Sequence, residues 1–318
     1  MTKEGREAAE LNLRSFAKVN LSLDVTGVRE DGYHTVETVM QQVSLHNEIN
    51  IRWEPYQGQE FGIAVSNSKP YLPTDSRNLA YRAALIMAEQ AERLLGEKPV
   101  GTVRIHINKR IPVAAGLGGG SGNAAAVMIG LNRLWRLRLD TRSLCRLGTP
   151  LGADVPFCVL VQNSRYTCAM GTGIGDVLTP IKKGMDKHIV LAKPAFGVST
   201  GEVFREIDSC PPEERPDSEA LLAGLQLGNM GKVYRNMINV LESYTLKKYP
   251  EVQKLKERLA AAGGAKKVLM SGSGPTVIGI YNHYGAARRA CLEMRDQGYE
   301  AYWAHTGKEL RGERNVKL

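Results

Sequence analysis

A glycine-rich stretch that leads directly into an apolar run limits what this chain can build more than any other feature. Between Gly116 and Gly120 four of the five residues are glycine, so the backbone can adopt positive φ and approach a ligand without intervening Cβ atoms. Ser121 and Asn123 are suitable N-cap residues, and the apolar residues that follow predict a largely buried helix up to Trp135. Because free N–H groups and the positive end of the helix dipole then point the same way, we expect an anion site, with phosphate as the favoured anion.

The alternative is a flexible surface loop that precedes a helix by chance. The five residues before the glycines, from Ile111 to Ala115, are all apolar, whereas a loose linker is normally polar. The phosphate interpretation is therefore favoured. The sequence of the stretch matches neither GxxxxGK[ST] nor GxGxxG, so it is neither a Walker loop nor a Rossmann fingerprint.

Composition narrows the class of protein. A length of 318 residues with 43% hydrophobic content is that of an ordinary globular protein with one large domain or two. The opening MTKEGREAAELNLR is charged and lacks a signal peptide's apolar segment, so we expect a cytoplasmic protein without membrane association. Five cysteines without a CxxC pair indicate reduced thiols rather than disulfides or zinc. The net charge of +9 suits a small ligand that carries phosphates, and nucleic acid is disfavoured because no compact basic run contains aromatics.

The first half reads as strands followed by a helix and another strand. Residues 16–25 alternate between apolar and polar, which predicts a strand with one buried face and leaves Lys18, taken alone, as a solvated charge on the other face. A turn at residues 30–32 and further strand patterns up to residue 53 follow. A helix is expected over residues 78–95, capped by Thr74, Asp75 or Ser76 and stopped by Gly96. Residues 103–107 then form a strand that delivers the chain to the glycine stretch.

Asp154 is the candidate catalytic carboxylate. It lies in LGADVP, ahead of an apolar run ending at Val161 that we expect to be a strand. A carboxylate placed between glycine and a core strand is partly desolvated, which raises its basicity unless a cation such as a lysine lies nearby. On this fragment alone, a structural role is equally well supported, in which Asp154 caps a turn before Pro156.

The second half repeats a mixture of strands and helices. A capping box, Ser199-x-x-Glu202, predicts a helix that carries Phe204. The remaining pattern predicts strands at residues 188–192, 268–270, 276–281 and 299–303, and helices at residues 219–226, 232–241, 250–262 and 286–297. The turn SGSGP at residues 271–275 is either a tight connection between strands or a second array of backbone donors. Without regular βαβ alternation, the order of elements predicts an α+β protein with two lobes and a cleft between them.

Three motifs carry a resemblance to a known family. They are FAKVNLSL at residues 16–23, PVAAGLGGGSGNAAA at residues 112–126 and MSGSGPTV at residues 270–277. Together they resemble the three signatures of the GHMP kinase superfamily, which includes galactokinase, homoserine kinase and mevalonate kinase. The chain also resembles one branch of that superfamily. This closer resemblance is carried by the stretches AKVNLSLDVTGVREDGYHTVET, KRIPVAAGLGGG, GLNRLW, LGADVPF and GVSTGEVF. The resemblance covers roughly residues 15–281. It implies an N-terminal ribosomal-protein-S5-like, ATP-binding domain at residues 1–165 and a C-terminal ferredoxin-like α/β sandwich, the substrate-binding domain, at residues 166–318.

The resemblance also implies a reaction. Members of that branch use ATP and Mg²⁺ to phosphorylate the 2-hydroxyl, on a tertiary carbon, of a cytidine-diphosphate-linked methylerythritol in the non-mevalonate isoprenoid pathway. Carried over by motif, Asp154 orients or deprotonates that hydroxyl, and Lys18 is the cation beside it. A pair in contact would keep Asp154 ionised while Lys18 offsets charge on the transferring phosphoryl group. The implied partners are two small molecules, ATP and the cytidyl substrate, and the chain is compatible with a monomer or a homodimer.

The remaining site residues are implied in three groups. The ATP group is Asn78, Lys109, Pro112, Val113, Ala114, Ala115, Gly116, Leu117, Gly118, Gly119, Gly120, Ser121 and Gly122. The substrate group is Asn20, Tyr33, His34, Asp154, Thr200 and Phe204, and the second loop beside the phosphates is Ser271, Gly272, Ser273 and Gly274. Aromatic rings suit stacking on cytosine. Without the resemblance, Tyr33 and Phe204 would be interpreted as core residues. For His34, a surface position after a turn is an equally good interpretation.

Two departures from the family pattern affect these expectations. The family has a second serine where this chain has Gly122, so the metal ligands are left unassigned. The segment at residues 163–169 is NSRYTCA where the family reads like GGTALA. The alternatives are a GHMP kinase for another small alcohol, of the homoserine or mevalonate type, and a nucleotide-binding relative without catalysis, which the missing hydroxyl at residue 122 would suggest.

Overall fold

The computed structural model describes residues 7–56 and 60–307 of the chain. The first six residues of the opening stretch lie outside this range, so the expectation about location that was drawn from that stretch stays a prediction. Within the described ranges, no helix combines the length and the apolar character that crossing a bilayer requires.

Two sheets and their helices make up the molecule. The elements up to the second lobe are β1 (Ala9–Val28), β2 (His34–Pro55), β3 (Phe61–Asn67), α1 (Leu79–Leu95), β4 (Gly101–Asn108), α2 (Gly119–Leu134), α3 (Thr141–Gly148), η2 (Thr149–Leu151), α4 (Asp154–Asn163), β5 (Cys168–Thr172) and β6 (Val177–Ile181). The second lobe contains β7 (His188–Lys193), α5 (Thr200–Glu206), η3 (Ile207–Ser209), α6 (Ser218–Leu227), α7 (Met230–Asn236), α8 (Glu242–Lys248), α9 (Pro250–Ala261), β8 (Ala265–Met270), β9 (Val277–Tyr281), α10 (Tyr284–Asp296) and β10 (Glu300–His305).

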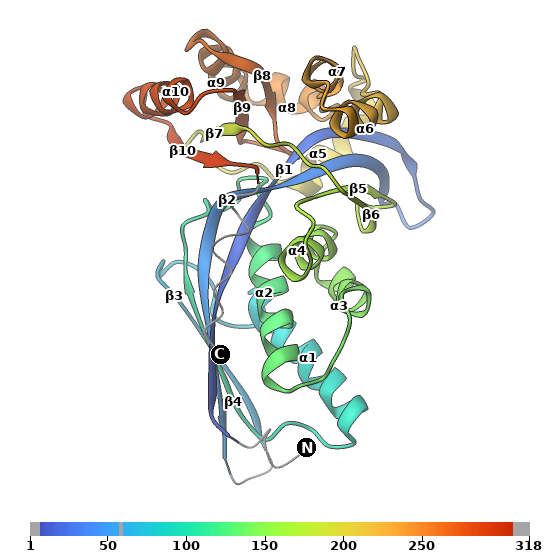
Figure 1. Ribbon diagram of the computed structural model, residues 1–318, viewed down its shortest axis with the longest axis vertical. Coiled ribbons are helices and arrows are strands. Elements are labelled where there is room, and N and C mark those ends of the chain that lie inside the picture. The colour runs from blue at the N-terminus through green and yellow to red at the C-terminus, as the bar shows by residue number, and fades with distance from the viewer. Residues whose placement is uncertain (1–6, 57–59, 308–318) are drawn as a thin grey trace.

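The first sheet is organised around the long antiparallel pair β1 and β2. The sheet order is β3-β4-β2-β5-β6, and β1 pairs with β2 outside this path. In Figure 1 the two long strands run from the lower lobe to the upper one, and helices α1 to α4 lie on one side of them. The first apolar core fills the space between this sheet and helices α1, α2 and α4. The strands thus carry residues from the core of one lobe to the junction with the other.

The middle of β1 corrects the expectation of a single buried face. Every residue from Ser15 to Leu23 is buried. Val19 and Leu21 belong to a core shared with β7 and β9 of the second lobe. The opposite face, which carries Lys18, is covered by the glycine stretch and α4. An alternating pattern predicts one polar face, but only the tertiary structure decides whether that face meets water.

Helix α1 follows the predicted range, but its N-cap is different. Asn78 caps it, accepting a hydrogen bond from the Ala80 N–H, whereas we expected Thr74, Asp75 or Ser76. Gly96 ends the helix in the left-handed conformation, as predicted.

The second sheet has the antiparallel order β10-β7-β9-β8. Helices α8, α9 and α10 contribute to the core on one of its faces. The two lobes are joined along the halves of β1 and β2 that lie nearer their connecting hairpin. Leu23 of β1 exchanges backbone hydrogen bonds with residues 238 and 240, and the Gln41 amide donates to the Thr306 carbonyl. The mixed α and β composition and the two sheets agree with the predicted two-lobed fold.

Two expected elements differ from the structure, and three strands were not expected. The apolar run from Asp154 to Val161 is helix α4 and not a strand. An apolar run of this length has no periodicity that separates a buried strand from a buried helix, and Pro156 is tolerated because it lies in the first helical turn. The helix expected at residues 232–241 ends at Asn236, and a separate helix, α8, starts at Glu242. Strands β3, β5 and β6 were not predicted. The predicted domain boundary at 165/166 stays a prediction, although β5 and β6 extend the first sheet to Ile181.

Candidate active site

Lys18 and Asp154 lie in contact although 136 positions separate them in the sequence. The Lys18 Nζ is 3.2 Å from the Asp154 Oδ2, with 6% of the lysine side chain and 36% of the aspartate side chain exposed. Asp154 is the first residue of α4, where the partial positive charge of a helix N-terminus favours a carboxylate. The pair therefore combines a buried ammonium with a carboxylate that still reaches the cleft.

A chain of hydrogen bonds fixes the lysine from the β1 side. The Lys18 Nζ donates to Asn20 Oδ1 at 2.8 Å, and the Asn20 amide donates to Thr38 Oγ1 at 2.8 Å. The Thr38 hydroxyl donates in turn to the Ser22 carbonyl at 2.7 Å. Thr38 was not among the predicted site residues. The strand alternation that places Lys18, Asn20 and Ser22 on one face is what aligns this chain.

The glycine stretch begins the helix earlier than expected. Gly118, at φ +64°, is the N-cap of α2 and Gly119 is the first helical residue, so Ser121 and Asn123 lie inside the helix and do not cap it. A Cβ on Gly118 would stand 2.9 Å from the Lys18 Cγ, and the Lys18 N–H donates to the Leu117 carbonyl. The missing side chain at Gly118 therefore makes room for Lys18 to cross the loop.

Asn47 anchors the entrance of the glycine stretch and was missed from the sequence. It is fully buried in β2. Its side-chain oxygen accepts hydrogen bonds from the N–H groups of Arg110 and Ile111 at 2.9 and 2.8 Å. Its amide donates to Asn123 Oδ1 at 2.8 Å. One side chain thus joins the start of the loop to α2. Because the partners are 63 or more positions away, no local pattern could indicate this role.

The second glycine loop, residues 271–274, packs against the first. A Cβ on Gly116 would stand 2.7 Å from the Ser271 carbonyl oxygen, so only glycine fits at this crossing. The Ser271 hydroxyl accepts a hydrogen bond from the Asn20 N–H, and Ser273 and Thr200 hydroxyls are 2.9 Å apart.

Asn239 is a second residue missed from the sequence. It is buried between α7 and α8, and its amide donates to the Met270 and Gly272 carbonyls, each at 2.8 Å. It thereby holds the second glycine loop in place. Asn239 lies three positions before α8 and its Oδ1 accepts from the Leu241 N–H, but the continuous helix expected at residues 232–241 hid this turn.

A cleft of about 990 Å³ lies where these elements meet. The predicted residues that line it are Lys18, Asn20, Tyr33, His34, Gly116, Ser121, Asp154, Thr200, Phe204, Gly272 and Ser273. The predicted residues outside its lining are Asn78, Lys109, residues 112–115, Leu117, residues 118–120, Gly122, Ser271 and Gly274. The structure thus gathers residues of the substrate group in one cavity but brings only two of the ATP group to it.

The side chains of Asn78 and Lys109, which were predicted to bind ATP, make hydrogen bonds within the protein. The Asn78 side chain caps α1. The Lys109 Nζ donates to the Ile111 carbonyl, and burial lowers the pKa of Lys109 to about 8. Lys109 lies next to the glycine stretch, since a Cβ on Gly119 would stand 3.2 Å from the Lys109 Nζ. Leu79, which follows Asn78 in the chain, would stand 3.4 Å from a Cβ on Gly120.

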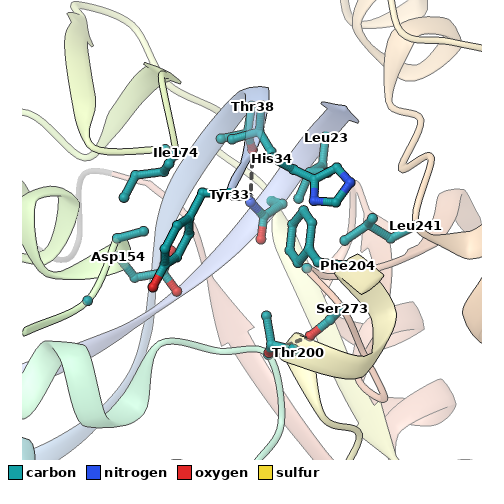
Figure 2. Close-up of a pocket in the computed structure, with 18 of the residues that line it drawn as sticks. Leu23, Tyr33, His34, Thr38, Asp154, Ile174, Thr200, Phe204, Leu241 and Ser273 are labelled. Atoms are coloured by element: carbon teal, nitrogen blue, oxygen red, sulfur yellow. Dashed lines mark hydrogen bonds between the residues drawn. The ribbon is translucent and has the colours of Figure 1, made fainter. Parts of the chain in front are cut away.

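Aromatic rings also line the cleft, those of Tyr33, His34 and Phe204. Tyr33 is 64% exposed, so core packing does not explain it. The rings of His34 and Phe204 lie 5.6 Å apart with a tilt of 42°. Figure 2 shows Tyr33 and Asp154 among the residues that line the cleft, and the His34 and Phe204 rings next to each other. The hairpin between β1 and β2 supplies Tyr33 and His34, whereas α5 supplies Phe204.

Position 122 faces away from the cleft. A Cβ on Gly122 would stand 2.6 Å from the Ser15 Oγ and 3.1 Å from the Phe16 carbonyl oxygen, both in β1. A serine here would point into the buried contact between α2 and β1. Gly122 therefore does not remove a hydroxyl from the cleft, and Ser121, which lines it, remains in place.

Comparison with known proteins agrees with this geometry. The family model for the GHMP kinases N terminal domain matches residues 78–162, and the GHMP kinases C terminal model matches residues 220–300. The chain is 44% identical over 281 residues to the 4-diphosphocytidyl-2-C-methyl-D-erythritol kinase of Alkaliphilus metalliredigens (strain QYMF), which covers 88% of this chain and 91% of the relative. It is 43% identical over 285 residues to the protein of that name from Geobacillus thermodenitrificans (strain NG80-2), covering 90% and 93%. A crystal structure of 4-(cytidine 5'-diphospho)-2C-methyl-D-erythritol kinase superposes with a TM-score of 0.74 at 34% identity, covering 94% of this chain and 100% of the other.

Proposed function

The chain belongs to the GHMP kinase family and within it to the 4-diphosphocytidyl-2-C-methyl-D-erythritol kinases, and from this premise we propose how its cleft performs the reaction. The enzyme uses ATP to phosphorylate the 2-hydroxyl of the cytidyl substrate in the non-mevalonate route to isoprenoid precursors. In the proposed arrangement the reacting hydroxyl lies at Asp154, the nucleotide phosphates lie at the two glycine loops, and the cytidine lies at Tyr33, His34 and Phe204. The contact between Lys18 and Asp154 inside the cleft is the observation that carries this proposal.

Phosphoryl transfer needs mainly positioning and charge stabilisation. The substrate oxygen forms a bond to the γ-phosphorus of ATP, the bond from that phosphorus to the β,γ-bridging oxygen breaks, and ADP leaves with the electron pair. Asp154 orients the hydroxyl and accepts its proton. The Lys18 ammonium, held by Asn20, offsets the charge that develops on the transferring group. Lys18 also holds the Asp154 carboxylate in place through their contact at 3.2 Å.

Mg²⁺ belongs to the proposal, and the donors on the cleft fit it. The Ser121 hydroxyl and the Asp154 carboxylate line the same cavity. Mg²⁺ takes most of its ligands from phosphate oxygens and water and needs only one or two from the protein. The described residues contain no cluster of three or more His, Cys, Asp or Glu side chains that could hold a metal ion. When bound, the ion would neutralise phosphate charge, while the residues above hold the hydroxyl.

The test is ADP formation with the cytidyl substrate, with and without Mg²⁺, in wild type and in Asp154→Asn and Lys18→Met. We expect each substitution to lower kcat by about 10²- to 10⁴-fold while the Kd for ATP stays within about threefold, since both groups act on the transferring group. Lys193→Met is a matched control, because Lys193 is 4% exposed, pairs with Glu300 at 3.3 Å in the second sheet and does not line the cleft. Near-normal turnover in either cleft variant would contradict the assigned roles.

A substrate panel separates the alternative kinases. Turnover of homoserine or mevalonate to the exclusion of the cytidyl substrate would reject the proposed substrate. The missing hydroxyl at residue 122 had suggested a nucleotide-binding relative without catalysis. That observation no longer supports it, because Gly122 faces β1 and not the cleft.

A further inference from the structure

Ala114, just before the glycines, has a backbone conformation that its own side chain disfavours. Its φ of +49° lies in the left-handed region, which residues with a Cβ rarely adopt. An alanine keeps such a conformation only where the surrounding structure holds it there. The segments that contact Ala114 are therefore the ones that determine the shape of the chain at this point.

The conformation of Ala114 belongs to an alternating series. Positive φ recurs at Ala114, Gly116 and Gly118, at +49°, +70° and +64°, and is absent from Ala115 and Leu117 between them. A left-handed residue beside one with negative φ turns successive N–H groups toward one side, an arrangement that binds anions. The two glycines adopt positive φ at little cost because they have no Cβ. Ala114 is thus the member of the series that needs support from outside.

That support comes from the second lobe. Gly197 lies in the turn at residues 194–199, between β7 and α5. A Cβ on Gly197 would stand 2.7 Å from the Ala114 Cβ and 3.2 Å from the Ala114 carbonyl oxygen. Gly197 is not among the glycines with positive φ, so its own backbone conformation does not require glycine. The close approach to Ala114 is therefore the reason for glycine at residue 197.

The turn at residues 194–199 is fixed on both sides of Gly197. The Phe196 ring stacks on the Tyr249 ring, with centroids 5.7 Å apart and a tilt of 29°. Val198 is buried in the core of the second lobe. The residue that follows Ala114 is likewise buried, in the core that both lobes share. A side chain added at residue 197 would therefore meet Ala114 between two fixed segments and change its backbone conformation.

We propose that Gly197 is a positioning residue, which holds Ala114 in the left-handed conformation and so sets the N–H groups of the glycine stretch for the phosphates of ATP. Neither residue lines the cleft, so the effect reaches ATP through Gly116, which does. The inference rests on the proposed placement of the phosphates at this stretch. A packing contact without this role would change the stability of the protein and leave its affinity for ATP unaltered.

Calorimetric titration of full-length wild type and Gly197→Ala with ATP and Mg²⁺ tests the proposal. We expect the Kd for ATP to rise about tenfold in Gly197→Ala, the effect of losing about one hydrogen bond to a charged group. In turnover, kcat and KM for the cytidyl substrate should stay within about threefold of wild type, because the loss concerns binding of ATP and not the chemical step. A rise in that KM as large as the rise in the Kd for ATP would contradict the assignment.

Gly285→Ala is the matched control. Gly285 is also exposed and has no positive φ, and a Cβ on it would meet only the end of the Arg289 side chain, at 3.7 Å. Its affinity for ATP should equal that of wild type.

A second substitution separates this role from a loss of folding. Ala114→Gly removes the Cβ that Gly197→Ala would strike, and glycine adopts φ +49° without strain. The double variant should therefore bind ATP within about threefold of wild type. An unchanged Kd in Gly197→Ala, or a double variant that binds ATP as weakly as Gly197→Ala, would overturn the proposal. If circular dichroism shows that Gly197→Ala does not fold, the double variant decides alone, by whether it folds and binds ATP in that range.

Failure of this inference and failure of the proposed function are distinguishable. If wild type turns over the cytidyl substrate but Gly197→Ala leaves the Kd for ATP unchanged, the inference about Gly197 is wrong and the proposed function stands. If wild type binds ATP but fails to turn over the cytidyl substrate, the proposed function is wrong. The comparison of ATP affinities then still decides the role of Gly197, because it requires no second substrate.

Discussion

Gly122 and Ser15 should be energetically coupled, and the coupling can be worked out from the structure. An alanine at residue 122 places a Cβ 2.6 Å from the Ser15 Oγ, a separation that packed atoms do not tolerate. Ser15 is in the strand β1 and fully buried, so its hydroxyl has little room to yield. Gly120 in the same helix offers a comparison, because its nearest neighbour to a new Cβ is Leu79 Cδ1 at 3.4 Å, an ordinary contact.

The magnitudes follow from two opposing effects. Replacing glycine by alanine in a helix gains up to about 1 kcal/mol, because the unfolded chain loses freedom. Overpacking a tight site costs about 1–3 kcal/mol. We therefore expect Gly120→Ala to be neutral or slightly stabilising and Gly122→Ala to destabilise by about 1–2 kcal/mol. The Ser15 hydroxyl makes no hydrogen bond within the described residues, so Ser15→Ala alone should be neutral or stabilising.

The assay is urea unfolding of wild type, the three single variants and the Ser15→Ala/Gly122→Ala double variant, followed by circular dichroism. The expected coupling energy in the double-mutant cycle is about 1–2 kcal/mol in the direction of rescue. Equal stability of Gly122→Ala and Gly120→Ala, or no rescue by Ser15→Ala, would refute the assignment of residue 122 to the interface between α2 and β1. Gly122→Ser should likewise leave the Mg²⁺ dependence of turnover unchanged, since its hydroxyl would not face the cleft.

Two further predictions concern the glycine stretch. Burial lowers the pKa of Lys109 from 10.5 to about 8. Below pH 8 the buried ammonium therefore lowers the free energy of unfolding, and this loss disappears as the pH rises toward 10.5. Lys109→Met should therefore be more stable than wild type near pH 7, by up to about 3 kcal/mol, and denaturant titrations from pH 7 to 10.5 should show the gap closing; a constant gap would argue against it. Gly118→Ala should lower kcat, because the new Cβ forces φ +64° on an alanine and displaces Lys18. Gly96→Ala, at φ +77° in open space among the described residues, carries the backbone strain alone, and equal activities of the two variants would count against displacement of Lys18.

Much of the fold was predictable where the physics is local. The strand at residues 103–107 and the helix at residues 78–95 were found with nearly the observed bounds, because alternation and helical periodicity record which faces are buried. The order of strands and helices was sufficient for the two-lobed α+β class. Helix α4 was mistaken for a strand for the converse reason, since burial on all sides leaves no period to interpret.

The sequence by itself determined the ingredients of this enzyme: the glycine stretch, the second glycine loop, the family and the candidate residues Lys18 and Asp154. Only the tertiary structure decided that these two side chains meet at 3.2 Å, that Asn47 and Asn239 hold the two loops, and that Gly197 lies against Ala114. It also decided that residue 122 faces β1, which no motif records. The physical reason is that a local sequence pattern reports the burial and backbone preference of neighbouring residues. A site, in contrast, is made by contacts between elements that are distant along the chain, and the packing of the whole protein sets their orientation.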